Sequence, residues 1–463
     1  MSALIGLAAG LLLLAWERAS PGKAPRRRQW AALAAVAVAL AFAVLAPPRG
    51  GGPGGTLVFD AYGTFFSVVV LIVGGLTLVT LQETCEQLDL PTGELYPLVL
   101  FALFGAMLAG MAGELLLLAV ALECSAACAR RLSGRPWLKH PDTAIGGLLL
   151  AGAAAVFAAT GTTGLAALEA LPVSDDGPGA LLLVGLGLTV AGLAGRAGAA
   201  PFHLASVGLV ADAPAPIGGM ITAAVRAAAL AALGRVLLSL PTLAPHGAEA
   251  LWWLSALSLL AGSVGAVAQT DLRRMLAYGA TANAGFVLMA LAAVDAGGAA
   301  SNPRLSGVLF YLLAHAFMIV GATSALAALA RGGEHRTTLG DLAGLGRERP
   351  WLSIALTVCL LSLAGAPLTM GFVGRFYLFA AAAGGGLYGL TAVGGVASVI
   401  GAAVYLRPVT WLYMREGDTA DLPATSAGYA AVAAACLFLL LFGLMPGELI
   451  ARCLSGLLSL GAG

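Results

Sequence analysis

The chain of 463 residues is too apolar for a soluble protein. Hydrophobic residues make up 60% of it and charged residues 10%, with a mass of 46.1 kDa and a mean hydropathy of +0.94. A soluble domain carries about 25% charged residues, so the composition excludes a soluble enzyme, a disordered chain and a nucleic-acid-binding protein. The net charge of +1 creates no strong overall field. The sequence therefore predicts an integral membrane protein without a nucleic-acid partner.

Apolar segments bounded by charges or by Gly and Pro recur along the whole chain. Helices of about 17 to 25 apolar residues can cross a bilayer, and the sequence predicts about fourteen of them. They cover residues 3–16, 29–46, 59–82, 95–112, 114–131, 143–160, 179–199, 215–239, 251–268, 275–294, 305–330, 352–382, 386–413 and 425–445. The expected fold is an all-α polytopic membrane protein with lipid around it.

The basic residues separate into two sets when the loops between these segments are numbered in order. Most of the 24 lysines and arginines lie in odd-numbered loops, and the opposite side holds only Arg49, Arg304 and Arg452. Loops rich in Lys and Arg stay in the cytoplasm, so both termini are expected to face outward. The first apolar run precedes its charges, which is unlike a signal peptide, and it is therefore counted as a span.

Two of the predicted helices are interrupted, one near residues 196–201 and one near residues 365–375. The residues expected to form these breaks are Pro201, Pro367, Gly371 and Gly374. Interrupted helices at matching positions in two halves are typical of inverted-repeat transporters, whose ions pass near the breaks. We therefore predict two inverted five-helix repeats. The alternative is that Pro and Gly are simply common in membrane helices.

The predicted repeats divide the chain into four parts. An N-terminal segment of three helices, residues 1–94, precedes the first repeat, residues 95–240. The second repeat covers residues 251–413, and a C-terminal helix and tail follow over residues 414–463.

Charged side chains inside the predicted spans are the strongest functional candidates. They are Glu123, Arg196, Arg226, Arg235 and Arg375. A charge within a span is costly and by default lines an ion pathway in the bundle interior. The sequence therefore predicts a row of charges across the midplane, with a structural buried ion pair as the alternative for Glu123 and Arg226. Arg235 lies near the end of its helix and is expected to reach the membrane interface.

Two histidines are candidate proton relays, because imidazole titrates near neutral pH. His203 follows the first break, and His315 lies in the predicted span 305–330. For each of them the alternative is an ordinary packing role.

The six cysteines form no CxxC motif and no cluster with metal-ligand spacing. We therefore expect no metal and no redox cofactor in this chain.

Several short motifs follow one another in a specific order between about residues 95 and 415. They are Pro201-Phe202-His203-Leu204, Ala213-Pro214-Ala215-Pro216, Gln269-Thr270-Asp271-Leu272-Arg273-Arg274-Met275-Leu276-Ala277-Tyr278, Ser362-Leu363-Ala364-Gly365-Ala366-Pro367, Gly371-Phe372-Val373-Gly374-Arg375-Phe376-Tyr377 and Tyr405-Leu406-Arg407. This ordered set resembles the antiporter-like membrane subunits of respiratory complex I. Within that family it is most similar to the N-type subunits of bacterial NADH:quinone oxidoreductase (NDH-1).

The resemblance implies a place in the membrane arm of a proton-translocating complex in a bacterial inner membrane. The chain would supply a pair of half-channels and a charged midplane axis, beside other antiporter-like and small hydrophobic subunits. NADH, FMN, iron–sulfur clusters and quinone would be used by the whole complex, and this chain would bind none of them. A cation/proton antiporter subunit and a membrane-bound hydrogenase subunit are the alternatives.

Carried over residue by residue, the resemblance makes Glu123 the glutamate of the fifth span, paired with a cation at Arg196. Two further family lysines correspond to Arg226 and Arg375, so all three lysine positions hold arginine in this chain. Arginine does not release its proton in proteins, and a non-pumping structural subunit is therefore a further alternative. The histidine that the family carries after the Leu-Ala-Tyr motif corresponds to Asn283.

Overall fold

The computed structural model describes most of the chain in ten stretches. They are residues 2–20, 25–45, 50–87, 93–134, 142–171, 177–240, 244–294, 305–328, 337–416 and 426–458. The regular structure in these stretches is helical except for one small hairpin, in which β1 (Gly50–Gly51) pairs antiparallel with β2 (Val58–Phe59). The all-α expectation is therefore confirmed.

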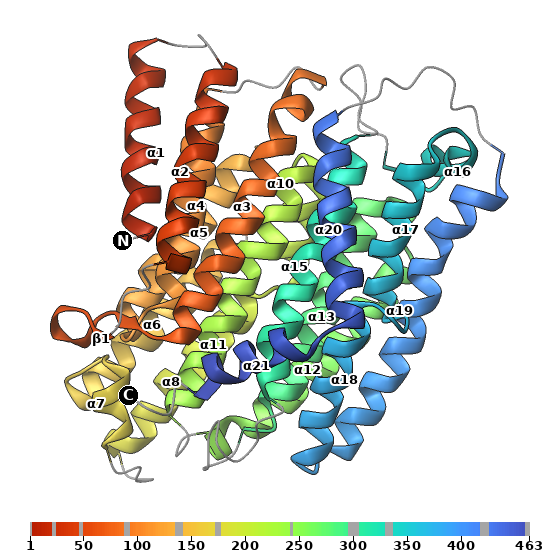
Figure 1. Cartoon of the computed structure of the whole chain (residues 1–463). Helices are drawn as coiled ribbons and strands as arrows, with labels where there is room; N and C mark the ends of the chain where they lie inside the picture. Colours follow the sequence, from red (N-terminus) through yellow and green to blue (C-terminus); the bar gives the residue numbers. More distant parts are fainter. Residues whose placement is uncertain are drawn as a thin grey trace.

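The long helices lie side by side in one bundle, from α1 at one edge to α19 at the other (Figure 1). In chain order the helical segments are α1 (Ser2–Ala19), α2 (Pro25–Leu45), α3 (Ala61–Gln87), α4 (Leu95–Gly110), α5 (Leu115–Leu132), α6 (Asp142–Thr160), α8 (Gly177–Arg196), α9 (His203–Asp212), α10 (Ala215–Met220), η3 (Ile221–Arg226), α11 (Ala227–Ser239), α12 (Ala244–Val267), α13 (Leu272–Leu291), α15 (Ser306–Ala327), α17 (Pro350–Ala364), α18 (Met370–Gly384), α19 (Tyr388–Met414), α20 (Ser426–Leu444) and α21 (Gly447–Leu458). Shorter turns form α7 (Leu165–Glu169), α16 (Leu345–Glu348) and the 3₁₀ turns η1 (Pro53–Gly55) and η5 (Gly340–Leu342).

Nine helices of the described part of the chain are long and apolar enough to cross a membrane, and α4, α17 and α18 are shorter apolar helices. Every segment that the sequence predicts as a span falls on one or more of the helices given above. The polytopic membrane class is confirmed. The count of fourteen spans and the inverted relation of the two repeats stay predictions.

The interior of the bundle is formed by α15 and by the continuous rod α10–η3–α11. All residues of α15 are buried, and so are all residues of the rod from Ala215 to Leu238. A helix that is apolar on all sides is suited to such a position, and the many alanines of the rod allow close contact between helices. The middle of the rod is a π-helix, η3, a feature that is frequent at functional sites. Polar side chains on these two elements are therefore enclosed by protein.

Both predicted interruptions are present. The first separates α8, which ends at Arg196, from α9, and its turn contains Gly198 at φ +76° and a cis peptide bond before Pro201. The second separates α17 from α18 and contains Pro367, with Gly365 at φ +81° as the C-cap of α17. Glycine at this left-handed position is the usual way to end a helix.

The second break is shorter than predicted, because α18 already begins at Met370. Gly371 and Gly374 therefore lie inside α18, where they allow close packing. A Cβ on Gly371 would lie 2.0 Å from the carbonyl oxygen of Ser362, and one on Gly374 would lie 2.9 Å from Tyr311. These two glycines serve the contacts of α18 rather than the interruption itself.

The start of α3 is tied to α11 by a buried ion pair. Arg235 Nη1 and Nη2 lie 2.8 and 2.9 Å from the two carboxylate oxygens of Asp60, and its Nε donates to the carbonyl oxygen of Gly110. The side chains of Arg235 and Asp60 are 2% and 9% exposed. The expectation that Arg235 reaches the membrane interface is therefore wrong, because a carboxylate before α3 offers it a bidentate partner inside the bundle.

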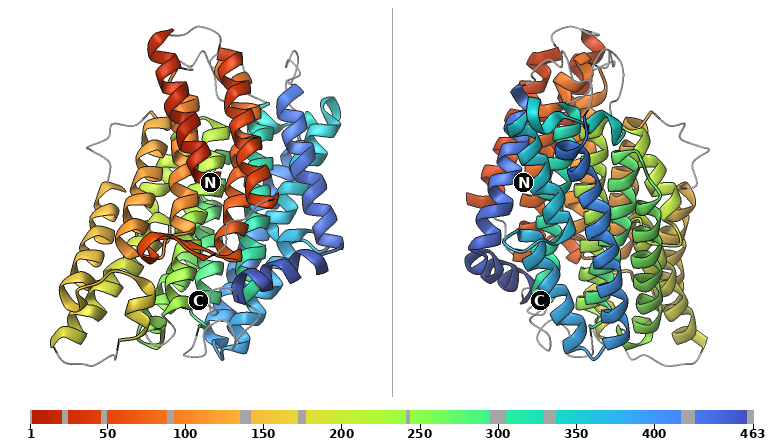
Figure 2. Two further views of the ribbon diagram at one scale, coloured as in Figure 1. Left: turned by 60° about the vertical axis from the view of Figure 1, so that its left-hand side comes forward. Right: turned by 90° about the vertical axis from the view of Figure 1, so that its right-hand side faces the viewer.

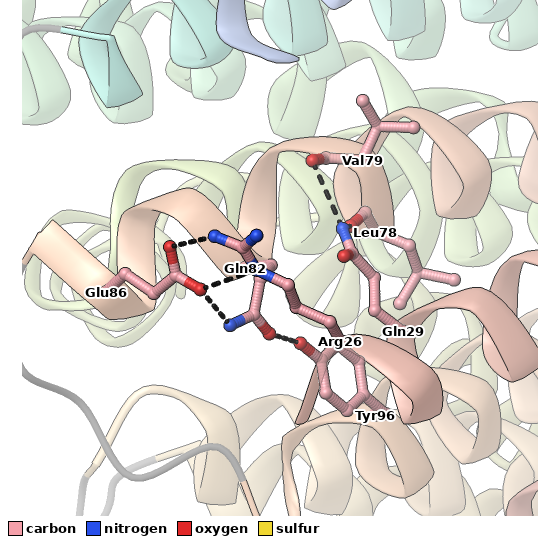
Figure 3. Close-up of polar contacts among 7 residues, drawn as sticks. All are labelled: Arg26, Gln29, Leu78, Val79, Gln82, Glu86 and Tyr96. Carbon is pink, nitrogen blue, oxygen red and sulfur yellow. Dashed lines mark hydrogen bonds and ion pairs between the residues drawn. The ribbon is translucent and has the colours of Figure 1, made fainter. Parts of the chain in front are cut away.

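The other end of α3 is tied to α2 and α4 by a polar network (Figure 3). Arg26 Nε on α2 lies 3.3 Å from Glu86 Oε1, and the Gln82 amide donates to the same carboxylate at 2.7 Å. The hydroxyl of Tyr96, at the start of α4, donates to the side-chain oxygen Oε1 of Gln82. Both ends of α3 thus contact the predicted first repeat.

The last helix departs from the direction of the others. α20 and α21 meet at an angle of 89°, so α21 lies across the bundle, as Figure 2 shows. It packs against α3 and α15.

Candidate functional site

The carboxylate of Glu123, in the middle of α5, lies between two arginines. Arg196 Nη2 donates to Oε1, and Arg130 Nη2 lies 3.7 Å from Oε2. Both arginine side chains are 3% exposed and that of Glu123 is 25% exposed. With all three groups ionised, the cluster carries one net positive charge in the bundle.

The local sequence explains how these groups meet. Arg196 is the last residue of α8, where the helix dipole favours a cation. On α6, Gly146 makes room for the carboxylate, because a Cβ there would lie 2.4 Å from the carboxyl carbon of Glu123. Arg130 follows Glu123 by seven residues on the same helix, and this spacing places both on one face. Arg130 is not among the charged candidates predicted from the sequence, although its seven-residue spacing from Glu123 was available as a signal.

The second cation, Arg226, lies against the first break. It is the last residue of η3, and a Cβ on Gly198 would lie 2.9 Å from its guanidinium carbon. Its Nη1 is 3.5 Å from the carbonyl oxygen of Ala277. Because Gly198 follows Arg196 by two residues, one short segment after α8 connects the Glu123 cluster with Arg226.

A small cavity beside Arg226 is lined by polar side chains from three elements. Asn283 of α13 and both Tyr311 and His315 of α15 line it together with Arg226. About 10 Å³ of it is open to the centre of a water molecule, close to the minimum that holds one water. The Tyr311 hydroxyl donates to Asn283 Oδ1 at 2.5 Å. His315 Nε2 and Asn283 Nδ2 are buried without a hydrogen-bond partner among the described residues.

A second cavity lies on the other side of Asn283 and reaches Arg375. It is also lined by Ser263 of α12 and Tyr405 of α19, and about 20 Å³ of it is open to the centre of a water molecule. Arg375 donates to the carbonyl oxygens of Leu363 and Ala364 at the end of α17, at 2.8 Å for Ala364. The carbonyl end of a helix attracts cations, so the second break holds the third cation of the row.

The structure thus places four predicted residues, Glu123, Arg196, Arg226 and Arg375, along one line of contacts and cavities, with His315 beside Arg226. His203 is at the start of α9 and lines neither cavity. Its ring packs edge-on against Tyr278 at 6.1 Å between centroids.

Sequence reasoning did not single out Tyr311 or Tyr405 as site residues. Tyr311 precedes His315 by four residues, a spacing that puts both on one helix face. Tyr405 comes from α19, which is far away in the sequence, and only the packing of α13 against α19 brings its hydroxyl to Gly279.

Residues 143–401, more than half of the chain, match the family described as NADH:quinone oxidoreductase/Mrp antiporter, TM. The NADH-quinone oxidoreductase subunit N of Trichlorobacter lovleyi is 33% identical over 376 residues, which cover 78% of this chain and 76% of the relative. A chain of respiratory complex I from Thermus thermophilus with bound Aureothin superimposes with a TM-score of 0.82 at 29% identity. That match covers 98% of this chain and 100% of the other.

A chain of the Mrp complex from Dietzia sp. DQ12-45-1b shares the fold, with a TM-score of 0.84 at 21% identity over 99% of this chain and 96% of the other. The fold and the family match together define an antiporter-like membrane protein. More narrowly, the chain belongs to the family of subunit N of NADH-quinone oxidoreductase, the antiporter-like subunits of complex I.

Proposed function

We propose that this chain translocates protons in the membrane arm of an NADH:quinone oxidoreductase, along the row from Glu123 to Arg375. The observation that carries this proposal is the continuity of buried polar groups inside an otherwise apolar bundle. The Glu123–Arg196 pair adjoins Arg226 through Gly198, and two small cavities that share Asn283 continue to Arg375. Charges are expensive in a membrane and are retained where an ion pathway needs them.

The charges along this row divide into one group that can titrate and cations that cannot. Arginine stays protonated, so Arg196, Arg226 and Arg375 act as fixed positive charges that orient water and bias their neighbours. Glu123 is the charge-coupled gate at one end. Two unit charges about 10 Å apart at an effective dielectric of 20 interact by about 1.5 kcal/mol, which changes a rate by about tenfold.

A third small cavity supports an entry half-channel at the first repeat. It is lined by Arg273 at the start of α13 and by Thr323, and Thr222 of η3 lines both this cavity and the one beside Arg226. By the distribution of basic loops, Arg273 belongs to the cytoplasmic side. Protons would therefore enter past Arg273 and Thr222, and leave near the second break at Arg375.

Within the complex this chain would be a subunit without a redox centre of its own. Quinone reduction would take place in other subunits, with NADH, FMN and iron–sulfur clusters bound there. Other antiporter-like and small hydrophobic subunits would be its protein partners, in a bacterial inner membrane with both termini outside. Its relatives are named as subunits of NADH-quinone oxidoreductase, which favours this assignment over a separate antiporter or a hydrogenase subunit.

Two substitutions of Arg226 test whether the row conducts. We expect Arg226→Lys to keep the proton yield per electron of the reconstituted complex, because the positive charge stays in place. Arg226→Ala removes the central charge and should lower proton-coupled turnover by about tenfold. NADH:quinone activity and the amount of assembled complex are recorded in parallel. Wild-type proton yield and turnover in both variants would instead identify a structural subunit that does not pump.

A further inference from the structure

The Glu123 cluster holds one carboxylate and two cations, and its two contacts differ in kind. Arg196 Nη2 donates a hydrogen bond to Oε1, whereas Arg130 Nη2 lies 3.7 Å from Oε2. A charge-assisted hydrogen bond is about 2.7–2.9 Å long, so the contact with Arg130 is an ion pair that is too long for a hydrogen bond. The carboxylate is therefore bound to Arg196 and faces Arg130.

Burial distinguishes Arg130 from its neighbour on α5. Arg130 and Arg131 both lie in the last turn of the helix, where the helix dipole favours a cation. The Arg131 side chain is 64% exposed and contacts Glu94, whereas the Arg130 side chain is 3% exposed and faces Glu123. Taking a guanidinium out of water is expensive unless an opposite charge lies close to it. The dipole favours a cation but does not require a buried one, so the position of Arg130 indicates a role beside the carboxylate.

The carboxylate has room to move between the two guanidinium groups. It lies over Gly146 of α6, where a Cβ would be 2.5 Å from Oε1 and 2.6 Å from Oε2. Bringing Oε2 from 3.7 Å to a hydrogen-bond distance from Arg130 takes about 1 Å of movement. The terminal torsion of a glutamate side chain has a broad range, so rotation of the carboxylate supplies part of this shift while α5 stays in place.

We propose that Arg130 is a positioning residue that receives the carboxylate of Glu123 when the carboxylate leaves Arg196. This inference rests on the proposed function and assigns a second position to the gate within it. In this step the hydrogen bond between Oε1 and Arg196 breaks, and one between Oε2 and Arg130 forms. The carboxylate stays ionised throughout, so no proton or electron is transferred and no covalent bond changes.

The shift changes which cation of the row is neutralised. With the carboxylate on Arg130, the charge of Arg196 is no longer balanced by Glu123. Arg196 precedes Gly198 by two residues, and the Arg226 guanidinium adjoins Gly198, so the added positive charge acts on Arg226 across the first break. A carboxylate that left Arg196 with no second cation to bind would be costly inside the bundle. Arg130 therefore makes the opening of the pair accessible.

The experiment compares charge removal at two adjacent positions in the complete complex. Arg130→Gln and the matched control Arg131→Gln each remove one positive charge from the last turn of α5, and Arg130→Lys keeps it. We expect Arg130→Gln to slow proton-coupled turnover about tenfold, Arg130→Lys to recover most of the loss, and Arg131→Gln to match wild type. Glu123→Gln/Arg130→Gln should be no slower than Glu123→Gln, because Arg130 acts through the carboxylate. Proton yield per electron, NADH:quinone activity and assembly are measured for each variant.

The results separate this inference from the proposed function. If Arg130→Gln keeps wild-type proton yield and turnover while Glu123→Gln loses them, the row conducts and the role assigned to Arg130 is wrong. A double variant much slower than Glu123→Gln would also overturn that role, since Arg130 would then act on something other than the carboxylate. Wild-type behaviour of both Arg130→Gln and Glu123→Gln would overturn the proposed function as well.

A structure of the wild-type complex during turnover tests the same step without a substitution, and it decides the matter if Arg130→Gln fails to assemble. Electron cryo-microscopy of the complex supplied with NADH and quinone should resolve a class of particles in which the Glu123 carboxylate is hydrogen-bonded to Arg130. A carboxylate that stays on Arg196 in every class would overturn the inference.

Discussion

Glu123 is positioned by a glycine of the neighbouring helix α6 as well as by its two arginines. Its carboxylate occupies the space over Gly146, where any Cβ would overlap it. The next residue, Gly147, has no atom within 4 Å of the position that its Cβ would take. Of two adjacent glycines on α6, Gly146 is buried against the carboxylate and Gly147 is exposed.

We predict that Gly146→Ala impairs proton translocation, whereas Gly147→Ala does not. The added methyl group has to displace the carboxylate from Arg196, and misplacing a reacting group by about 1 Å can cost up to about 100-fold in rate. Because a flexible side chain gives way, assembly and thermal stability should stay near wild type. Proton yield and turnover of the reconstituted complex measure the effect. Equal behaviour of the two alanine variants would show that the position of Glu123 does not matter.

The ends of α3 show how differently two ion pairs contribute to one helix. Asp60 and Arg235 are enclosed at the start of α3, whereas Arg26 and Glu86 at its other end are 74% and 44% exposed. An exposed pair is screened by solvent and contributes little. A buried pair is different, because the loss of one partner leaves an uncompensated charge inside the protein.

Asp60→Ala should therefore destabilise the full chain by about 3–5 kcal/mol, and Arg26→Ala should leave its stability unchanged. Thermal unfolding of the detergent-solubilised protein compares the two variants. The double substitution Asp60→Ala/Arg235→Met removes the stranded charge as well, and most of the lost stability should return. A single Asp60→Ala variant as stable as wild type would mean that water reaches Arg235.

The sequence predicts where the helices lie far better than how their polar side chains pair. Apolar length and the Pro and Gly of the two breaks are local signals, and both breaks are present in the structure. The partner of Arg235 is 175 positions away in the chain, so its helix alone indicated an interfacial arginine. The narrow width of the second break was not predicted either, because Gly371 and Gly374 are glycines for the sake of their packing against Ser362 and Tyr311, which a local pattern does not reveal.

In the whole molecule, the polar row runs through the most enclosed elements. The rod α10–η3–α11 carries Arg226 and is buried from Ala215 to Leu238, and α15, which carries His315, is buried over its whole length. At the bundle edge, α1 and α2 expose apolar side chains such as Leu12 and Trp30 to the surroundings. The membrane class, the family and the charged candidates could therefore be predicted from the sequence. The order in which cavities connect the candidates depends on packing across α13, α15, α18 and α19.

Proton yield per electron of the reconstituted complex with Glu123→Gln in this subunit is the most direct measurement. Glutamine keeps the size of the side chain and removes the charge that faces Arg196 and Arg130. If the row translocates protons, we expect this variant to assemble normally while proton-coupled turnover falls by about tenfold. Normal assembly with wild-type proton yield and wild-type NADH:quinone activity would contradict proton translocation by this chain.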